Sequence, residues 1–506
     1  MRRAPMPGVY RAYGEAPSSE EQPAPELADL GRYGRRLVDR FVRTARSGEQ
    51  PRFRPIIAHH LGVPVDDLTI VEEHWRGYEH VNVQTALDAW LAEPGREHEL
   101  IGMTEYRHRG SFGLGDLLAQ SGSEDYGHGH RPGPVSWVPL PSGPQGSTLP
   151  CVRVGVLLVS EGEDRLVLLV RGADPESDMA GVAVDVMATR EGRAREVASR
   201  LRELALEHNV YRGEVVSFGH SMFGERSSML RFHTRRRLPP DALILPETTF
   251  ADVRRQVVGV ARNRDRLRAA GQHLKRGLLL YGPPGVGKTH TVRYLVGELT
   301  DTTVVELTGE TLPLIKEACS IARSLQPALI VVEDVDLIAE QRDTYHGETP
   351  LLFMLLNEMD GLDEDADVVF LLTTNRADLL EPALAQRPGR VDQAVHIDLP
   401  DREDRRRLIE LYRAGLQVDL SRLDQVLDRS DGVTASFLKE LLRRAAVIAA
   451  DGHDDEEGTP DASPLAVSAD DLDAALADLL DTRNAMTRAV LGYRGGPARE
   501  VSGFGS

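Results

Sequence analysis

Apolar and polar positions follow a regular pattern between residues 245 and 400. Short runs made almost entirely of apolar residues alternate with stretches in which apolar residues recur at helical spacing. These apolar runs are 277–281, 303–307, 328–332 and 368–373. Strands that are apolar on both faces are typical of a parallel sheet covered by helices. This part of the chain is therefore predicted to be an α/β domain.

A second folded part is predicted upstream. Apolar runs at 152–159 and 166–170 flank the polar stretch SEGEDR, which indicates a β-hairpin. Apolar residues at 193–208 have helical spacing. Three further strand candidates are 182–187, 214–218 and 229–233. We predict an α+β domain over 150–240, which either recognises a partner or serves as a spacer.

The remaining segments are assigned from composition and spacing. Residues 1–25 are rich in Pro, Ser and Glu, as in disordered tails, and apolar spacing at 27–46 predicts an amphipathic helix. The other predicted segments are a small, mainly helical N-terminal module at 26–120, a linker rich in Gly, Ser and Pro at 121–149, C-terminal helices at 401–485 with an acidic loop at 451–463, and a flexible tail at 486–506.

The most informative motif is GPPGVGKT at 282–289, which fits the pattern GxxxxGK[ST]. It follows an apolar run and precedes a helical pattern, which is the strand–turn–helix context that the motif requires. Glycines let backbone N–H groups approach phosphate oxygens closely, Lys288 adds a positive charge, and the Thr289 hydroxyl can ligate Mg²⁺. The predicted nucleotide-binding residues are Gly282, Pro283, Pro284, Gly285, Val286, Gly287, Lys288, Thr289 and His290.

Acidic residues follow the apolar run 328–332, in the order Glu333-Asp334-Val335-Asp336. Carboxylates at the end of a buried strand are costly unless they serve a cation. Downstream of a P-loop, this pattern indicates a Walker B motif, with one carboxylate for Mg²⁺ and one that activates water. By position, Glu333 is predicted to bind the metal together with Thr289, and Asp334 to be the base. The alternative is a solvated acidic turn.

Charge and cysteine content narrow the range of partners. The 506-residue chain carries a net charge of −19, which repels nucleic-acid phosphates, so we expect no nucleic-acid partner. No apolar run reaches the ~18 residues of a membrane span, and the N-terminus lacks the apolar segment of a signal peptide. Cys151 and Cys319 are the two cysteines. Their spacing argues against a disulfide framework or a zinc site and favours the cytoplasm.

Together these motifs resemble the classical AAA family, which includes segregases, proteasomal ATPases and membrane-bound AAA proteases. The segments that carry the resemblance are TTFADV, LLLYGPPGVGKT, PALIVVEDVD, LLNEMDGL, VVFLLTTN and QRPGR, within about 245–481. The resemblance implies a P-loop α/β domain at 245–400 with a helical lid at 401–485. It also implies hydrolysis of ATP with Mg²⁺, with Asn375 as the sensor that positions the attacking water.

The resemblance further implies an assembly. Arg387 and Arg390 match the family's paired arginine fingers, which reach the ATP of a neighbouring copy and stabilise charge in the transition state. A homo-oligomeric ring, a hexamer, is therefore expected. Asp360-Gly361-Leu362 matches the position of the inter-subunit signalling motif, and 431–450 resembles the sensor 2 region of the lid.

The chain departs from the family's pattern at the Walker B motif and at the central pore loop, and it also lacks the motif of a zinc protease. The family usually has Asp-Glu at Walker B, whereas this chain has Glu333-Asp334. Asp is one methylene shorter than Glu, which sets the base back by about 1.5 Å and can reduce the rate strongly. Leu307 stands where the family has the pore-loop aromatic, and no HExxH motif of a zinc protease occurs.

Two functions fit these observations. In the first, a ring hydrolyses ATP to remodel, disassemble or assemble a protein client that binds through residues 26–240. In the second, the ring is a slow-turnover, ATP-dependent switch or scaffold that regulates a larger assembly. The Walker B order and the missing aromatic favour the second function, and the otherwise complete set of motifs favours the first. A DNA-handling ATPase fits poorly with the net charge.

Overall fold

The protein was studied as a computed structural model, and its chain forms two compact units. The first consists of residues 1–211 and 218–233, and the second of 212–217 and 234–506. The structure describes residues 52–104, 112–119, 130–173, 181–219, 229–336, 351–363, 365–378, 391–451 and 464–481. The predicted tails, the predicted helix at 27–46 and residues 452–463 of the acidic loop lie outside this part of the chain.

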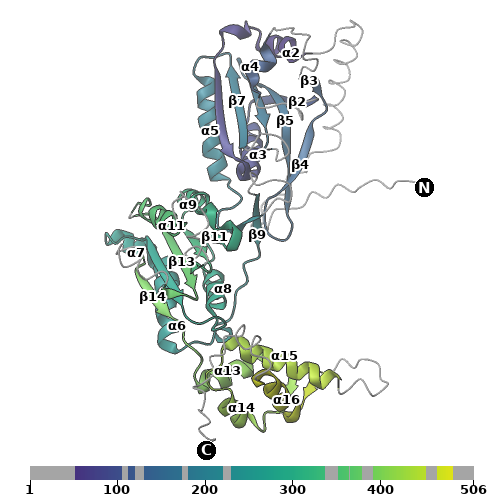
Figure 1. The fold of residues 1–506 in the computed structure, drawn as a ribbon. Coiled ribbons are helices and arrows are strands. Elements are labelled where there is room, and N and C mark those ends of the chain that lie inside the picture. Colours follow the sequence, from purple (N-terminus) through teal and green to yellow (C-terminus); the bar gives the residue numbers. More distant parts are fainter. Residues whose placement is uncertain are drawn as a thin grey trace, which may run out of the picture. The chain divides into compact units, whose positions relative to one another are not determined.

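The first unit is built on an antiparallel sheet (Figure 1) with the strand order β1-β7-β6-β5-β2-β3, and β4 pairs with the first half of β5. Its strands are β1 (Ile70–Arg76), β2 (Arg96–Thr104), β3 (Arg131–Gly133), β4 (Ser136–Pro141), β5 (Thr148–Glu161), β6 (Asp164–Arg171) and β7 (Gly181–Ala188). Its other elements are α2 (Phe53–Leu61), η1 (Val65–Asp67), η2 (Gly77–Glu79), α3 (His80–Leu91), α4 (Leu114–Leu118), α5 (Arg193–Glu207) and β9 (Met229–His233).

Helices cover both faces of this sheet. Because successive side chains of a strand point to opposite faces, Leu157 and Val159 of β5 pack with α3 and α5. Val156 and Leu158 of the same strand pack with α2 and α4. This burial on both faces explains why β5 and β6 are apolar at nearly every position. The predicted hairpin at 152–170 is confirmed, since β5 and β6 pair antiparallel.

The structure divides the N-terminal half differently from the prediction. Strands β1 and β2 lie within the predicted helical module at 26–120, yet they pair with β7 and β5 of the predicted 150–240 domain. Strands β3 and β4 lie within the predicted linker at 121–149. These strands were missed because β1 lies at the sheet edge and the first half of β2 is partly exposed, so that polar residues occupy many positions. Their pairing with distant strands stabilises them.

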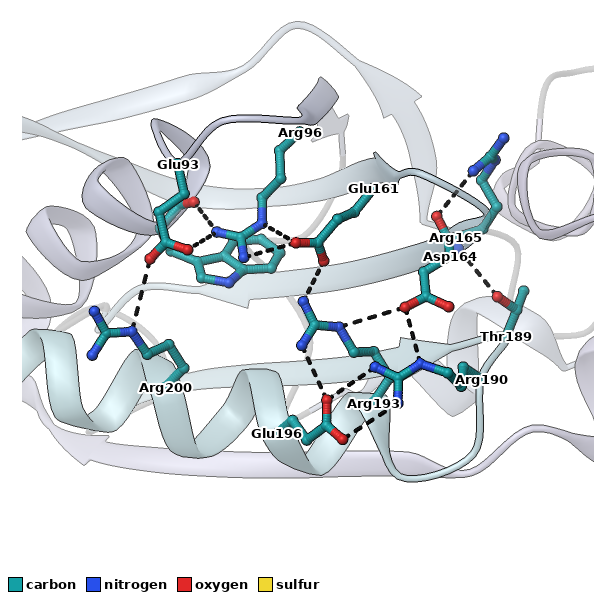
Figure 2. Close-up of polar contacts among 11 residues, drawn as sticks. Glu93, Arg96, Glu161, Asp164, Arg165, Thr189, Arg190, Arg193, Glu196 and Arg200 are labelled. Carbon is teal, nitrogen blue, oxygen red and sulfur yellow. Dashed lines mark hydrogen bonds and ion pairs between the residues drawn. The ribbon is translucent and has the colours of Figure 1, made fainter.

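A network of ion pairs connects several elements of this unit (Figure 2). The Cζ atom of Arg96 lies 4.4 Å from the centroid of the Trp90 ring, and its guanidinium pairs with Glu93 at 2.9 Å and with Glu161 at 3.0 Å. Arg193 of α5 pairs with the second oxygen of Glu161. Burial acts to raise the pKa of Glu161, but the hydrogen bonds and charges of Arg193 and Arg96 outweigh it and lower that pKa. Glu161 therefore ties the end of β5 to β2 and α5.

The second unit contains a parallel sheet with the order β14-β10-β13-β12-β11-β8. The four apolar runs of the sequence are its strands β10 to β13, so the predicted parallel sheet is confirmed. One assignment was wrong: residues 215–217, predicted to belong to the 150–240 domain, pair with 304–306 of β11. The strands are β8 (Val215–Gly219), β10 (Arg276–Tyr281), β11 (Thr303–Leu307), β12 (Ala328–Val332), β13 (Val368–Thr374) and β14 (Gln393–His396).

Helices pack against this sheet, and side chains of both form its hydrophobic core. Side chains of α6, η5 and α8 pack on alternate positions of β10 to β13, among them Leu278, Leu280, Leu329 and Leu371. The helices are α6 (Glu247–Arg254), the π-helix η5 (Arg255–Gly259), α7 (Val260–Ala269), α8 (Lys288–Glu298), α9 (Ile315–Ser324) and α11 (Leu351–Asp360), with the short 3₁₀ helices η4 (Pro240–Ala242) and η6 (Gly309–Leu314).

The C-terminal helices of this unit have a core of their own. They are α13 (Arg402–Tyr412), α14 (Leu423–Arg429), α15 (Ala435–Asp451) and α16 (Ala469–Leu480), and the short strands β15 (Leu416–Val418) and β16 (Leu465–Val467) pair in parallel. Side chains of α15 at helical spacing, including Leu438, Leu441 and Leu442, are buried in that core. Ser468 caps α16 by accepting from Asp471 N at 3.1 Å. In the described part of the chain, no helix is long and apolar enough to span a membrane.

Candidate nucleotide-binding site

The predicted phosphate-binding turn joins β10 to α8, as the motif requires. Its three glycines have positive φ angles: 151° at Gly282, 81° at Gly285 and 107° at Gly287. A Cβ atom at Gly282 would lie 2.1 Å from the carbonyl oxygen of Ile397, so no other residue fits there. At Gly287, the residue before α8, a Cβ would meet nothing within 4 Å. The turn therefore offers open backbone at the N-terminus of a helix, which suits an anion.

Lys288 holds the turn and the sensor strand together. Its ammonium group donates to the carbonyl oxygens of Gly282 at 2.9 Å and Pro283 at 2.8 Å, and to Oδ1 of Asn375 at 2.8 Å. Burial lowers the pKa of Lys288, while the negative charges of Asp334 and Asp336 oppose this shift. The structure thus brings together Lys288 and Asn375, two residues that the sequence analysis had assigned to separate motifs.

The acidic residues after β12 lie against the same groups. The Thr289 hydroxyl donates to Oε2 of Glu333 at 3.3 Å, and Nδ2 of Asn375 donates to Oδ1 of Asp334 at 3.3 Å. Burial raises the pKa of Glu333, and the negative charges of Glu306 and Asp334 raise it further. Positive charge beside Glu333, such as a metal ion would bring, favours its ionised form.

Asp334 has a backbone conformation that few residues adopt. Its φ angle is 53°, in the left-handed region, where Asp and Asn are enriched among residues other than glycine. Its backbone N–H donates to the Thr373 hydroxyl at 3.1 Å. This backbone turn at the end of β12 is what brings the Asp334 carboxylate to Asn375.

Asp336 is a member of the site to which the sequence analysis gave no role. This buried carboxylate accepts from the Thr374 hydroxyl at 2.8 Å and from the backbone N–H of Asn375 at 3.2 Å. It therefore fixes the end of β13, from which the Asn375 side chain extends. The signal was present in the Glu333-Asp334-Val335-Asp336 run, but only the fold shows which carboxylate faces the sensor strand.

Several other predicted residues make contacts outside this group. The Nε2 atom of His290 shares a hydrogen bond of 2.8 Å with the carbonyl oxygen of Ala242, and the contact of His290 with nucleotide stays a prediction. Leu307, predicted at the position of the pore-loop aromatic, is fully buried at the end of β11. Residues 360–362 comprise the last residue of α11 and the two that follow it, and the Lys275 ammonium donates to the carbonyl oxygen of Leu362 at 3.1 Å. Arg387 and Arg390 lie outside the described residues.

The C-terminal helices touch the phosphate-binding turn directly. The backbone N–H of Ser436, in the first turn of α15, donates to the carbonyl oxygen of Gly285 at 3.0 Å. A Cβ at Gly285 would lie 3.0 Å from the Thr434 hydroxyl oxygen, which shows how closely the two segments approach. The position of α15 is thereby coupled to the conformation of the turn.

The residues present fit a nucleotide triphosphate with Mg²⁺. The glycine turn supplies backbone donors, Lys288 supplies a cation, and Thr289 and Glu333 supply the oxygen ligands that Mg²⁺ prefers. Asp334 and Asn375 lie next to this group and can orient a water molecule. The donor set is therefore suited to phosphoryl transfer.

Comparisons with known proteins agree with this geometry. Residues 278–399 match the family described as "ATPase family associated with various cellular activities (AAA)". Over 206 residues the chain is 36% identical to the ATP-dependent zinc metalloprotease FtsH 2 of Sphaerobacter thermophilus, covering 38% of this chain and 31% of that protein. Over 231 residues it is 32% identical to FtsH of Thermus thermophilus, covering 40% of this chain and 36% of that protein.

A mycobacterial relative shows the same extent of similarity. The chain is 32% identical over 230 residues to FtsH of Mycobacterium tuberculosis, covering 41% of this chain and 30% of that protein. The chain thus spans about a third of the length of these relatives. The family match covers the strands and turns that hold Lys288, Glu333 and Asn375. Residues 278–399 therefore form a domain of the AAA family of ATPases, whose members use ATP with Mg²⁺.

Proposed function

We propose that this protein hydrolyses ATP as a closed ring of six copies and uses the energy to remodel a protein client. The observation that carries the proposal is the hydrogen-bonded chain from Lys288 through Asn375 to Asp334. These hydrogen bonds join Lys288, Asn375 and Asp334, to which we assign the roles of phosphate-binding cation, sensor and base. A change at the phosphate end is thus transmitted to the end that activates water.

Each residue of the site has a role in this proposal. Lys288 and the backbone of the turn hold the phosphates, and Thr289 and Glu333 hold the metal. Asp334 accepts a proton from water, and Asn375 keeps that carboxylate oriented. When bound, Mg·ATP supplies the phosphoanhydride bond and a cation that offsets charge on its oxygens.

The ring and the client rest on the family resemblance. Arg387 and Arg390 act across a head-to-tail interface, and such an interface forms a ring when the rotation between neighbouring copies closes. We assign client binding to residues 26–240, which include the described sheet of the first unit. The free, buried Cys151 and Cys319 suit the reducing cytoplasm that we propose as the location.

The decisive experiment is steady-state Mg·ATP hydrolysis over a range of protein concentrations, with Lys288→Ala as the control. A rate per subunit that rises steeply with concentration and disappears in Lys288→Ala supports active sites completed between neighbours. A rate no higher than that of Lys288→Ala at any concentration, with or without unfolded protein added, contradicts a working motor.

The second candidate function is a slow ATP-dependent switch or scaffold. Two observations favour it: the base at position 334 is an aspartate, and Leu307 is buried rather than available to grip a threaded chain. Stimulation of hydrolysis by an unfolded protein separates the two functions. A remodeller is accelerated by such a client, whereas a switch binds ATP tightly and shows little acceleration.

A further inference from the structure

A pocket in the second unit lies away from the nucleotide site. It has a volume of about 520 Å³ and is lined by Arg237, Leu238, Pro239, Pro240, Phe250, Arg254, Arg262, Tyr294 and Glu298. Lys288 begins α8 and Glu298 ends it, so the pocket and the phosphate-binding turn lie at opposite ends of one helix, about 15 Å apart along its axis.

Arginine charge dominates this pocket. Of the described residues that line it, Glu298 alone is acidic. Its carboxylate is 6% exposed and faces Arg237 at 3.4 Å, Arg254 at 3.8 Å and Arg262 at 3.1 Å. One carboxylate has too few oxygens for the donors of three guanidinium groups. The Arg237 side chain is 77% exposed, which leaves most of its donors to an incoming group.

The backbone of helix α6–η5–α7 is shaped to gather these arginines. In an uninterrupted α-helix, residues eight apart such as Arg254 and Arg262 point about 80° away from each other. The π-helix at Arg255–Gly259 takes extra residues into its turn, which rotates α7 back so that both side chains reach Glu298. Such π-segments occur frequently at functional sites.

The opposite wall is held in place independently of any ligand. Arg235 donates to the carbonyl oxygen of Val296, in the last turn of α8, at 2.8 Å. It also donates to that of Thr302, just beyond the helix, at 2.8 Å. A Cβ at Gly297 would lie 2.5 Å from the carbonyl oxygen of Arg236, so glycine is required for this close approach. The segment that carries Arg237 and Leu238 is therefore fixed against the helix, and the pocket is preformed.

The floor of the pocket is apolar. Phe250 and Tyr294 lie with ring centroids 5.4 Å apart, and Leu238 with two prolines completes the lining. We propose that this pocket binds a short acidic peptide segment of a partner protein, with an apolar side chain over the floor and carboxylates on the arginine rim. Guanidinium groups pair with carboxylates through two parallel hydrogen bonds. The overall charge of −19 repels an acidic peptide at long range, so its binding depends on the local positive charge of the arginines in this pocket.

The test is fluorescence anisotropy with the full chain and no nucleotide, so that the result does not depend on ATP hydrolysis. The probe is a short fluorescein-labelled peptide with a Leu-Phe centre flanked by glutamates, and the matched peptide carries glutamines instead. We expect saturable binding of the glutamate peptide that weakens with added salt. Arg254→Ala, Arg262→Ala and Arg237→Ala should each weaken binding about tenfold or more, since each removes a charge-assisted hydrogen bond.

Matched controls keep the test decisive. Arg268→Ala removes an arginine from the same helical region that pairs with Asp265 at 3.8 Å and does not line the pocket, so it should leave binding unchanged. Glu298→Gln should strengthen binding, because it removes the carboxylate that competes with the peptide. Arg237 is largely exposed, so its variant should keep the unfolding midpoint of the native protein.

Three outcomes would overturn the proposal. They are equal binding of the glutamine peptide, equal loss of binding in Arg268→Ala and Arg262→Ala, and no saturable binding at low salt. If inorganic pyrophosphate binds in a way that depends on Arg262 while the peptide does not bind, the pocket takes a small anion and the peptide proposal is wrong.

Discussion

Hydrogen bonds connect the residues of this site, so that each of them influences the position of the next. Lys288 has three acceptors, and one of them is Asn375, which in turn donates to Asp334. Asn375 is positioned from behind by Asp336 through its backbone N–H. Asp336 is therefore a positioning residue: it reaches the reacting groups only through the sensor strand.

We expect Asp336→Ala to reduce kcat by about tenfold or more, because hydrogen bonds to a charged group that contribute about 1.5–3 kcal/mol are lost. The KM for ATP should change less than kcat, because the Lys288 ammonium donates to Gly282, Pro283 and Asn375 and not to Asp336. Asp336→Asn should recover most of the rate, because its amide oxygen can accept the same two bonds. Steady-state kinetics and ATP binding on each variant provide the measurement.

The exposed Asp378→Asn is the matched control, since Asp378 pairs with Arg376 shortly after the same strand. A merely structural role for Asp336 predicts a different result, in which kcat per folded molecule stays unchanged while the unfolding midpoint falls. That result would remove Asp336 from the mechanism.

At the scale of elements, the turn between β10 and α8 depends on backbone space. Gly282 combines a φ of 151° with the Ile397 carbonyl oxygen 2.1 Å from where a Cβ would lie. Gly271 also has a positive φ, 69°, but a Cβ there meets nothing within 4 Å. Alanine at Gly271 would introduce backbone strain alone, whereas alanine at Gly282 would introduce strain and a steric clash.

Gly271→Ala should cost about 1–2 kcal/mol of unfolding free energy from backbone strain alone. Gly282→Ala should cost about 1–3 kcal/mol more, because the clash adds to the strain, and it should also abolish ATP binding. Denaturant unfolding followed by circular dichroism and a nucleotide-binding assay test both statements. Equal losses of stability in the two variants would mean that the contact with Ile397 relaxes without cost.

The ion-pair network around Glu161 gives the first unit a defined response to pH. The folded-state pKa of Glu161 is lowered, so its contribution to stability is present above the ordinary glutamate pKa of about 4.3 and is lost as the pH falls through the lowered folded value. We expect the unfolding free energy of this unit to decrease in that acidic window. Glu161→Gln should flatten the decrease, while the exposed Glu163→Gln should not.

Tryptophan fluorescence during urea unfolding measures this effect selectively, because Trp75, Trp90 and Trp137, the three tryptophans of the chain, all lie in the first unit. A slope in Glu161→Gln as steep as that in the unchanged protein would show that other carboxylates dominate the acid response.

At the scale of the whole molecule, the proposal requires neighbouring copies to complete each active site. Lys288→Ala removes the phosphate-binding cation but leaves Arg387 and Arg390 intact. The double variant Arg387→Ala with Arg390→Ala does the reverse. Each alone should be inactive if the arginines act across an interface.

Mixing the two inactive variants in equal amounts should restore hydrolysis, because roughly a quarter of the interfaces in a randomly mixed ring pair an intact turn with intact arginines. Phosphate release measured against the mixing ratio, after time for subunits to exchange, is the readout. Recovery with a maximum near equal amounts supports action in trans. No recovery, with mixed rings demonstrated by differently tagged copies, would contradict the action of the arginines across the interface.

The sequence was sufficient for the features that arise locally. The four apolar strands of the parallel sheet are apolar on both faces, so their pattern is strong and they occur where predicted. The phosphate-binding turn was predictable for the same reason: the glycines, Lys288 and Thr289 are neighbours in sequence, and their chemistry depends on a single strand–turn–helix unit. Glu333 and Asp334 were predictable too, because they are the two residues that directly follow β12.

Contacts between residues far apart in sequence could be identified only in the tertiary structure. Strands β1 and β2 carry polar residues at many positions, and pairing with β7 and β5 stabilises them more than their own propensity does. The hydrogen bonds that join Lys288 to Asn375 and Asn375 to Asp336 connect segments that follow three neighbouring strands, β10, β13 and β12. The arginine pocket depends on a π-helix that no spacing rule predicted. Local patterns encode elements because their causes lie within a few residues, whereas a site assembled from several elements is encoded only in how those elements pack.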